Sequence, residues 1–151
     1  MTLIETPELI DWPETHYVFI QRTGPFMQTA PEAWQAVSAL LPAIAAHNRI
    51  TRGMSLYRTA TSTYRAGFSI AEAPVNLPEG LEYECFPGGR YSRFVMTGSY
   101  ANLPFASGRV WQIASTTKLP LRDDWAIENY PNDPKTTQEA DLVTEILIPT
   151  E

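Results

Sequence analysis

Two ten-residue segments match each other without a gap, and this internal repeat constrains the fold more than any other feature of the chain. Residues 17–26 read YVFIQRTGPF and residues 91–100 read YSRFVMTGSY, at an offset of 74 residues. Each segment ends in a Thr-Gly turn and precedes a helical segment with a Trp-Gln pair, at Trp34 and at Trp111. Because the offset is about half of the 151-residue chain, the repeat predicts a duplicated structural unit.

Each half is predicted to follow the order β-α-β-β. After each helical segment come two runs that are rich in β-branched and aromatic residues and are bounded by turn-forming residues. These runs cover residues 54–60, 63–70, 125–132 and 142–149. The first helix is expected over residues 31–47, where Pro42 should kink it or divide it in two.

Two such units predict a single α+β domain, which the chain length also suits. The sheet is expected to be antiparallel or mixed, with the two main helices on one face and a ligand groove between the halves. The predicted bounds are about 15–72 for the first repeat, 73–89 for a linker and 90–150 for the second repeat, with a candidate extra strand at 81–86.

Charge and hydropathy exclude several classes of protein. The formal net charge is -6, and an acidic surface repels phosphates, so we expect no direct nucleic-acid binding. No segment approaches the ~18 consecutive apolar residues of a membrane span. The N-terminus carries acids where a signal peptide needs positive charge. We therefore expect a cytoplasmic protein without a membrane partner.

The chain has few residues for metal or covalent chemistry. The single cysteine, Cys85, cannot form an internal disulfide and is expected to be a small packed side chain. His16 and His47 do not combine with it in any usual zinc-binding spacing. No Gly-rich phosphate loop is present. We therefore expect no metal, no cofactor and no catalytic triad.

Glu128 is the strongest candidate for a binding residue. In the strand WAIENY, residues 125–130, alternate side chains point to opposite faces, which places Glu128 on the same face as Tyr130. Aligning the repeats at their tyrosines sets Tyr57 against Tyr130 and Ser55 against Glu128. A carboxylate flanked by aromatic rings suits a lipophilic cation, through ion pairing and cation–π attraction. The alternative is a solvent-facing glutamate on a half-exposed strand.

Four further aromatic residues have two interpretations. Their spacing fits an apolar core, which is the usual place of aromatic side chains, and it equally fits the lining of a ligand groove. The repeat favours equivalent roles in the two halves. The four residues are Phe26, Trp34, Tyr100 and Trp111.

The order of these motifs resembles the GyrI-like small-molecule-binding domain. The resemblance rests on YVFIQRTGPF, TYRAGFSI, FPGGRYSRFVMTGSYANLP and the tail IENYPNDPKTTQEADLVTEILIP. The tail is the most specific part, because Glu128 stands five residues before the Asp of Asn-Asp-Pro. This family includes the effector-binding domains of AraC-type and MerR-type multidrug-responsive transcription regulators, and also stand-alone proteins.

The resemblance implies two βαββ units with pseudo-twofold symmetry and a ligand groove between them. It implies that Glu128 lies at the floor of this groove, that Tyr57 and Tyr130 line it, and that the four aromatic residues above are further lining candidates. Two departures alter the expected groove entrance: the first hairpin reads YRTATSTYR in place of an Asp-Asp-Pro turn, and Pro42 interrupts the first helix. About 14 residues precede the first predicted strand, so we expect no DNA-binding segment there.

Three functions follow as hypotheses. The leading one is non-enzymatic binding of an amphipathic, cationic or aromatic small molecule, with a protein partner or a homodimer as further candidates. The second is a hydrolase of reactive electrophilic small molecules, with Glu128 as general base and Tyr130 or Tyr57 as proton donor. The third is a gyrase-inhibitor-like interaction protein, although the chain lacks the dense acidic run that would mimic DNA.

Overall fold

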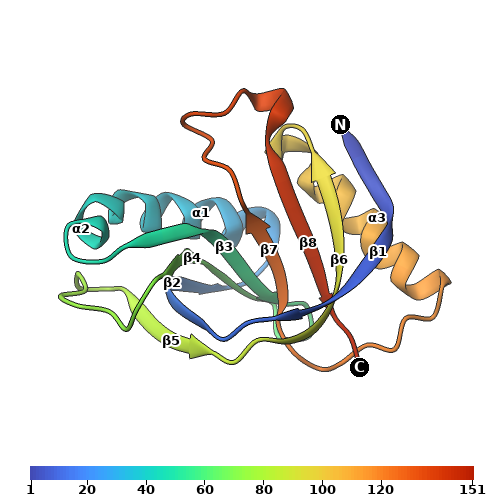
Figure 1. Ribbon diagram of the computed structural model, residues 1–151, viewed down its shortest axis with the longest axis horizontal. Helices are drawn as coiled ribbons and strands as arrows, with labels where there is room; N and C mark the ends of the chain where they lie inside the picture. Colours follow the sequence, from blue (N-terminus) through green and yellow to red (C-terminus); the bar gives the residue numbers. More distant parts are fainter. The chain divides into compact units, whose positions relative to one another are not determined.

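The computed structural model describes all residues, 1–151, and they form two compact units (Figure 1). Unit 1 comprises Met1–Trp12 and Gly89–Glu151, and unit 2 comprises Pro13–Gly88. The elements of unit 2 are β2 (Thr15–Thr23), α1 (Phe26–Ala39), α2 (Leu41–Ala45), β3 (Ile50–Arg58), β4 (Thr63–Ile70) and β5 (Glu82–Phe86). Those of unit 1 are β1 (Thr2–Trp12), β6 (Gly89–Thr97), η1 (Tyr100–Asn102), α3 (Leu103–Thr116), β7 (Ala126–Tyr130), η2 (Glu139–Asp141) and β8 (Val143–Pro149).

The two units have the same strand arrangement. In unit 2 the strand order is β5-β2-β4-β3, and in unit 1 it is β1-β6-β8-β7. Neighbouring strands within each unit are antiparallel throughout. The predicted α+β class and the duplicated β-α-β-β order are therefore confirmed, and each unit adds one outer strand to that order.

The strand registers also confirm the alignment of the repeat. The pair Thr23–Thr63 of β2 and β4 corresponds to the pair Thr97–Val143 of β6 and β8. In the adjoining ladders, Ser55 pairs with Ala66 and Glu128 pairs with Ile146. These positions correspond because Ala66 lies three residues after Thr63 and Ile146 lies three residues after Val143. Ser55 of unit 2 is thus the equivalent of Glu128, and Tyr57 is the equivalent of Tyr130.

The main helices match in the same way. Both have 14 residues, and the buried positions of α1 recur in α3 at a constant offset of 77. The matching pairs are Thr29 with Ala106, Ala33 with Val110 and Val37 with Ala114. At this offset Trp34 is the equivalent of Trp111. The three extra residues before α3 form the 3-10 turn η1.

Each helix covers one face of the sheet of its own unit. In unit 1 the core lies between α3 and the side chains of Phe94, Met96, Ile146 and Ile148, with Val110 and Ile113 on the helix side. In unit 2 the ring of Trp34 on α1 packs edge-on against Phe68 on β4, at 5.9 Å between centroids. No helix of the chain is long and apolar enough to cross a membrane.

In each unit a buried tyrosine hydroxyl bonds to a backbone carbonyl of β3 or of the residue before β7. Tyr17 on β2 donates a hydrogen bond to the backbone carbonyl of Met54 at 2.7 Å. Its repeat equivalent, Tyr91 on β6, donates to the carbonyl of Trp125 at 2.6 Å. Both tyrosines are fully buried. The two bonds connect β2 to β3 and β6 to the residue before β7, although the two acceptor carbonyls lie two residues apart in the alignment of the repeat.

Three local expectations were wrong. The N-terminus was not predicted as a strand, but it forms β1, which pairs with β6 and is exposed along most of its length. The first helix begins at Phe26 and not at residue 31, whereas its predicted division at Pro42 is confirmed, because α1 ends at Ala39 and α2 begins at Leu41. Cys85 is exposed, because β5 is an outer strand with one face open to solvent.

Candidate functional site

Glu128 lies on the helix-covered face of the unit 1 sheet. Its cross-strand partner is Ile146, and Ile146 packs against α3. Side chains alternate along β7, so Glu128 and Tyr130 share this face while Ile127 and Asn129 face the other way. The strand thus places one carboxylate on the face that packs against α3, and the predicted common face of Glu128 and Tyr130 is confirmed.

Burial determines the electrostatics of this carboxylate. Removal from water raises the pKa of Glu128 to about 7, and a hydrogen bond from the Tyr130 hydroxyl, at 3.0 Å, lowers it by a smaller amount. No arginine, lysine or histidine pairs with Glu128. A buried acid without a positive partner is costly when ionised. The fold therefore holds a carboxyl group whose ionised form has no positive partner.

Two tyrosine rings follow one another from Glu128: Tyr130 bonds to its carboxyl group, and Tyr100 packs against Tyr130. Tyr100 on η1 packs edge-on against Tyr130, at 5.4 Å between ring centroids. The hydroxyl of Tyr100 is buried and has no hydrogen-bond partner, and burial raises its pKa. Trp111 on α3 is partly buried against the core of unit 1. Four of the seven predicted site residues therefore belong to unit 1: Glu128, Tyr130, Tyr100 and Trp111.

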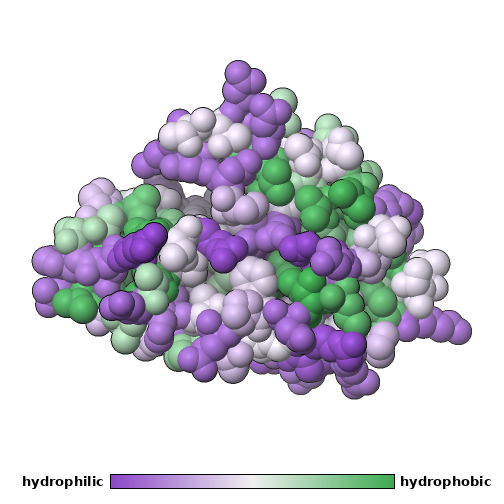
Figure 2. Space-filling model, in the orientation of Figure 1, coloured by the Kyte–Doolittle hydropathy of each residue, from purple (hydrophilic) through white to green (hydrophobic).

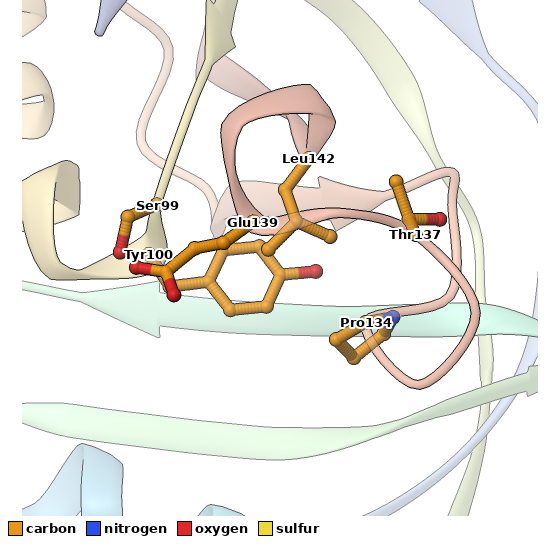
Figure 3. Close-up of a pocket in the computed structure, with 6 residues that line it drawn as sticks. All are labelled: Ser99, Tyr100, Pro134, Thr137, Glu139 and Leu142. Atoms are coloured by element: carbon orange, nitrogen blue, oxygen red, sulfur yellow. The ribbon is translucent and has the colours of Figure 1, made fainter.

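An open cavity of about 350 Å³ lies between Tyr100 and the loop that joins β7 to β8. It is lined by Ser99, Tyr100, Pro134, Thr137, Glu139 and Leu142. The hydroxyl of Tyr100 points along the cavity toward Pro134 and Thr137, and Glu139 lies beside its ring (Figure 3). The loop, at the top of Figure 2, is mostly hydrophilic. The cavity thus has a polar rim and an aromatic wall.

The Asn-Asp-Pro motif shapes this loop. The Asn132 side chain accepts a hydrogen bond from the Val143 backbone N–H and donates one to the carbonyl of Asp141, both at 3.0 Å. Asp133 accepts from the backbone N–H of Lys135 at 2.8 Å, which closes a tight turn. The side chains of the motif therefore hold the loop that supplies Pro134, Thr137 and Glu139 to the cavity lining.

The other three predicted site residues form a packed cluster in unit 2. Phe26 lies edge-on to Tyr57, at 5.6 Å between centroids, which repeats the geometry of Tyr100 and Tyr130. Trp34 donates from Nε1 to the hydroxyl of Tyr64 at 2.9 Å and to Ser55 Oγ at 3.1 Å. Tyr64 also packs against Phe26. Here a serine takes the place of the acid, and its polar atoms are internally bonded.

Sequence reasoning missed one residue in each unit: Tyr64 in the packed cluster of unit 2, and Thr144 in unit 1. Tyr57 pairs with Tyr64 across β3 and β4, and the same register sets Tyr130 opposite Thr144 across β7 and β8. Thr144 is fully buried, and its hydroxyl has no partner. Aligning the last strands of the two repeats, TYRAGFSI and VTEILIP, would have revealed this pair.

The opposite face of the unit 1 sheet carries an ionic network. Arg93 pairs with Glu145 at 2.9 Å and with Glu8 at 2.7 Å. Asn129 donates to the other oxygen of Glu145 at 2.7 Å. Because its charges pair with one another, this network joins β1, β6, β8 and β7. No group of three or more histidine, cysteine, aspartate or glutamate side chains converges on a point where a metal ion could be held.

Residues 5–151 match the family model described as the GyrI-like small molecule binding domain. No curated protein matches the chain. The solved structures similar to it share 16% sequence identity or less in the cases described below, so they bear on the fold alone.

Three of these solved structures illustrate the range. The C-terminal domain of EcmrR superposes with a TM-score of 0.79 at 16% identity, over 100% of this chain and 99% of that one. SAV2435 bound to tetraphenylphosphonium gives 0.74 at 13% identity, over 96% and 93% of the two chains. A hydrolase from Listeria innocua gives 0.61 at 13% identity, over 97% and 92%.

Proposed function

We propose that this chain, which belongs to the GyrI-like small-molecule-binding domain family, binds an amphipathic organic cation in unit 1, with Glu128 as the partner of the positive charge. One observation carries the proposal: Glu128 is a partly buried carboxylate, removed from water on the helix-covered face, with a tyrosine hydroxyl as its partner and no positive group. An organic cation would supply the missing charge in a region of low dielectric constant, where the attraction is strong.

The surroundings of Glu128 suit a cation that carries aromatic or apolar groups. Tyr130 and Tyr100 present rings next to the acid, and a ring face attracts a cation by about 0.5–2 kcal/mol. The adjacent cavity offers space with the Tyr100 ring as its wall. The solved relative SAV2435 holds tetraphenylphosphonium, a lipophilic cation, which supports a ligand of this kind.

A pair of probes separates charge from shape. Tetraphenylphosphonium and tetraphenylborate have nearly the same size and shape but opposite charges. We expect titration calorimetry at pH 8 to show binding of the phosphonium, and binding of the borate that is at least tenfold weaker. Glu128→Gln should weaken the phosphonium by roughly 10- to 150-fold, which corresponds to the 1.5–3 kcal/mol of a charge-assisted contact. Equal binding of the two probes would refute the proposal.

The Glu128–Tyr130 pair also favours a second function, hydrolysis of a reactive electrophile such as an epoxide. A carboxyl group with a pKa of about 7 is matched to proton transfer at neutral pH. Glu128 would take a proton from water as the water oxygen bonds to carbon. Tyr130 would give a proton to the oxygen released from that carbon, so that the product is a diol.

Turnover is tested by incubating the protein with styrene oxide and measuring the diol by chromatography. For a hydrolase, Glu128→Gln and Tyr130→Phe should each lower the rate by at least a hundredfold. Exposed Glu79, changed to Gln, is the matched control and should leave the rate unchanged. If the wild-type protein forms the diol no faster than the uncatalysed reaction does, binding remains as the proposed function.

A further inference from the structure

The binding site of unit 1 and the aromatic cluster of unit 2 are two versions of one arrangement. Three of the five places hold an aromatic ring in both units. Tyr57 corresponds to Tyr130 and Trp34 to Trp111, and each of the two tyrosines has a ring packed edge-on against it, Phe26 from the start of α1 and Tyr100 from the extra turn η1. The other two differ. Ser55 corresponds to Glu128, and Tyr64 corresponds to Thr144.

Unit 2 has one more aromatic ring in this arrangement than unit 1, and this ring belongs to Tyr64. Its hydroxyl lies 2.8 Å from Ser55 Oγ and 2.9 Å from Trp34 Nε1, and its ring centroid lies 5.8 Å from that of Phe26. The phenol is therefore bonded at its polar end and packed along its ring. Ser55 is fully buried beneath it.

In unit 1 the corresponding position lacks this ring. Thr144 follows the same register, but its side chain ends at a hydroxyl that is buried and has no partner. Leaving a buried hydroxyl unpaired is unfavourable, and native proteins rarely do so without a ligand, a water molecule or a functional reason. Glu128, in the place of Ser55, adds a carboxyl group on the neighbouring strand.

We infer that unit 1 binds an aryl group of its ligand in the place that the Tyr64 phenol fills in unit 2, with a hydroxyl or amino substituent of that group bonded to Thr144. This inference rests on the proposed function and specifies its ligand class: a cation that carries a phenol or an aniline. Thr144 then selects for the polar substituent, while Glu128 pairs with the charge.

Two cations whose charge does not depend on pH, and which differ only in one hydroxyl group, test whether Thr144 bonds to a polar substituent of the ligand. They are benzyltriphenylphosphonium and (4-hydroxybenzyl)triphenylphosphonium, titrated by calorimetry at pH 7.5 against the full chain. We expect the wild-type protein to bind the hydroxylated probe at least fivefold more tightly. Thr144→Val keeps the shape of the side chain and removes its hydroxyl, so it should reduce this preference to less than twofold.

Two variants test the position of the aryl group. Thr144→Tyr supplies the ring that unit 2 already has and should weaken both probes at least tenfold, while circular dichroism reports whether the chain still folds. Tyr64→Phe removes the matching hydroxyl from unit 2 and is the control, which should leave both affinities within twofold of wild type.

The outcomes are distinct. If the Thr144→Val variant still prefers the hydroxylated probe, the inference is overturned and the proposed function stands. The same holds if the wild-type protein shows no preference between the probes while Glu128→Gln weakens the binding of both. A folded Thr144→Tyr variant that binds as tightly as wild type also overturns it. If neither probe binds the wild-type protein, the proposed function fails and this inference fails with it.

Discussion

Glu128→Gln should stabilise the folded protein, and the gain should depend on pH. The pKa of Glu128 is about 7 in the folded protein, against a usual value of 4.5. Each pH unit of such a difference corresponds to about 1.36 kcal/mol. Ionised Glu128 therefore costs the folded state about 3 kcal/mol, and a glutamine of the same shape does not carry this cost.

The sign follows from proton uptake. Between pH 4.5 and about 7 the folded protein keeps a proton on Glu128 that the unfolded chain has released. Stability falls as the pH rises wherever the folded state binds more protons. The free energy of unfolding of the wild-type protein should thus fall through this window relative to that of the variant, and the difference should be constant above it.

Urea denaturation at pH 4.5, 6 and 8 measures this difference. We expect the two proteins to be nearly equally stable at pH 4.5, and the variant to be more stable by about 2–3 kcal/mol at pH 8. Glu79→Gln, at an exposed turn position, is the control and should show the same small difference at each pH. A Glu128→Gln variant that is destabilised, or whose advantage is constant with pH, would refute the reasoning.

Three further predictions concern the same residues and the repeat. Affinity for tetraphenylphosphonium, whose charge is fixed, should rise about tenfold per pH unit below pH 7 and level off above it, because ionised Glu128 binds the cation; a flat calorimetric profile would contradict this. Tyr130→Phe removes the bond that lowers the pKa of Glu128 and should move the midpoint of that profile to higher pH, whereas an unchanged midpoint argues against the bond. Tyr17→Phe and Tyr91→Phe should each lower the free energy of unfolding in urea by about 1–2 kcal/mol, and losses that differ by more than ~1 kcal/mol would argue against equivalent roles.

The central strands of each unit could be predicted because their signals are local. The run at 63–70 is β4 with the expected bounds, and the run at 142–149 begins one residue before β8. Matching turns and tyrosines then gave the correct alignment of Ser55 with Glu128. Strand alternation also indicated that Glu128 and Tyr130 share a face.

The remaining features depend on pairing between distant residues. The segment TLIETPELIDW contains Pro7 and three acids and has little alternation, so its strand character comes from hydrogen bonds to β6 and not from burial. At the start of α1 the ring of Phe26 packs against Tyr57 and Tyr64, and these contacts between distant residues are not apparent from the local sequence. The unpaired hydroxyl of Thr144 likewise becomes apparent only when the ladder is formed.

The pairing of β1 with β6 sets an order for folding during synthesis. Unit 2 is continuous in sequence and can complete its sheet once Gly88 has left the ribosome, whereas unit 1 needs Ile10 to pair with Tyr91 and then needs β8. Until β6 has been synthesised, β1 has no partner strand, and a long apolar strand without a partner is prone to aggregate. This strand contains one proline and three acids, Pro7, Glu5, Glu8 and Asp11, which disfavour pairing of β1 with strands of other chains. The same residues make β1 hard to predict from the sequence and protect the nascent chain from aggregation.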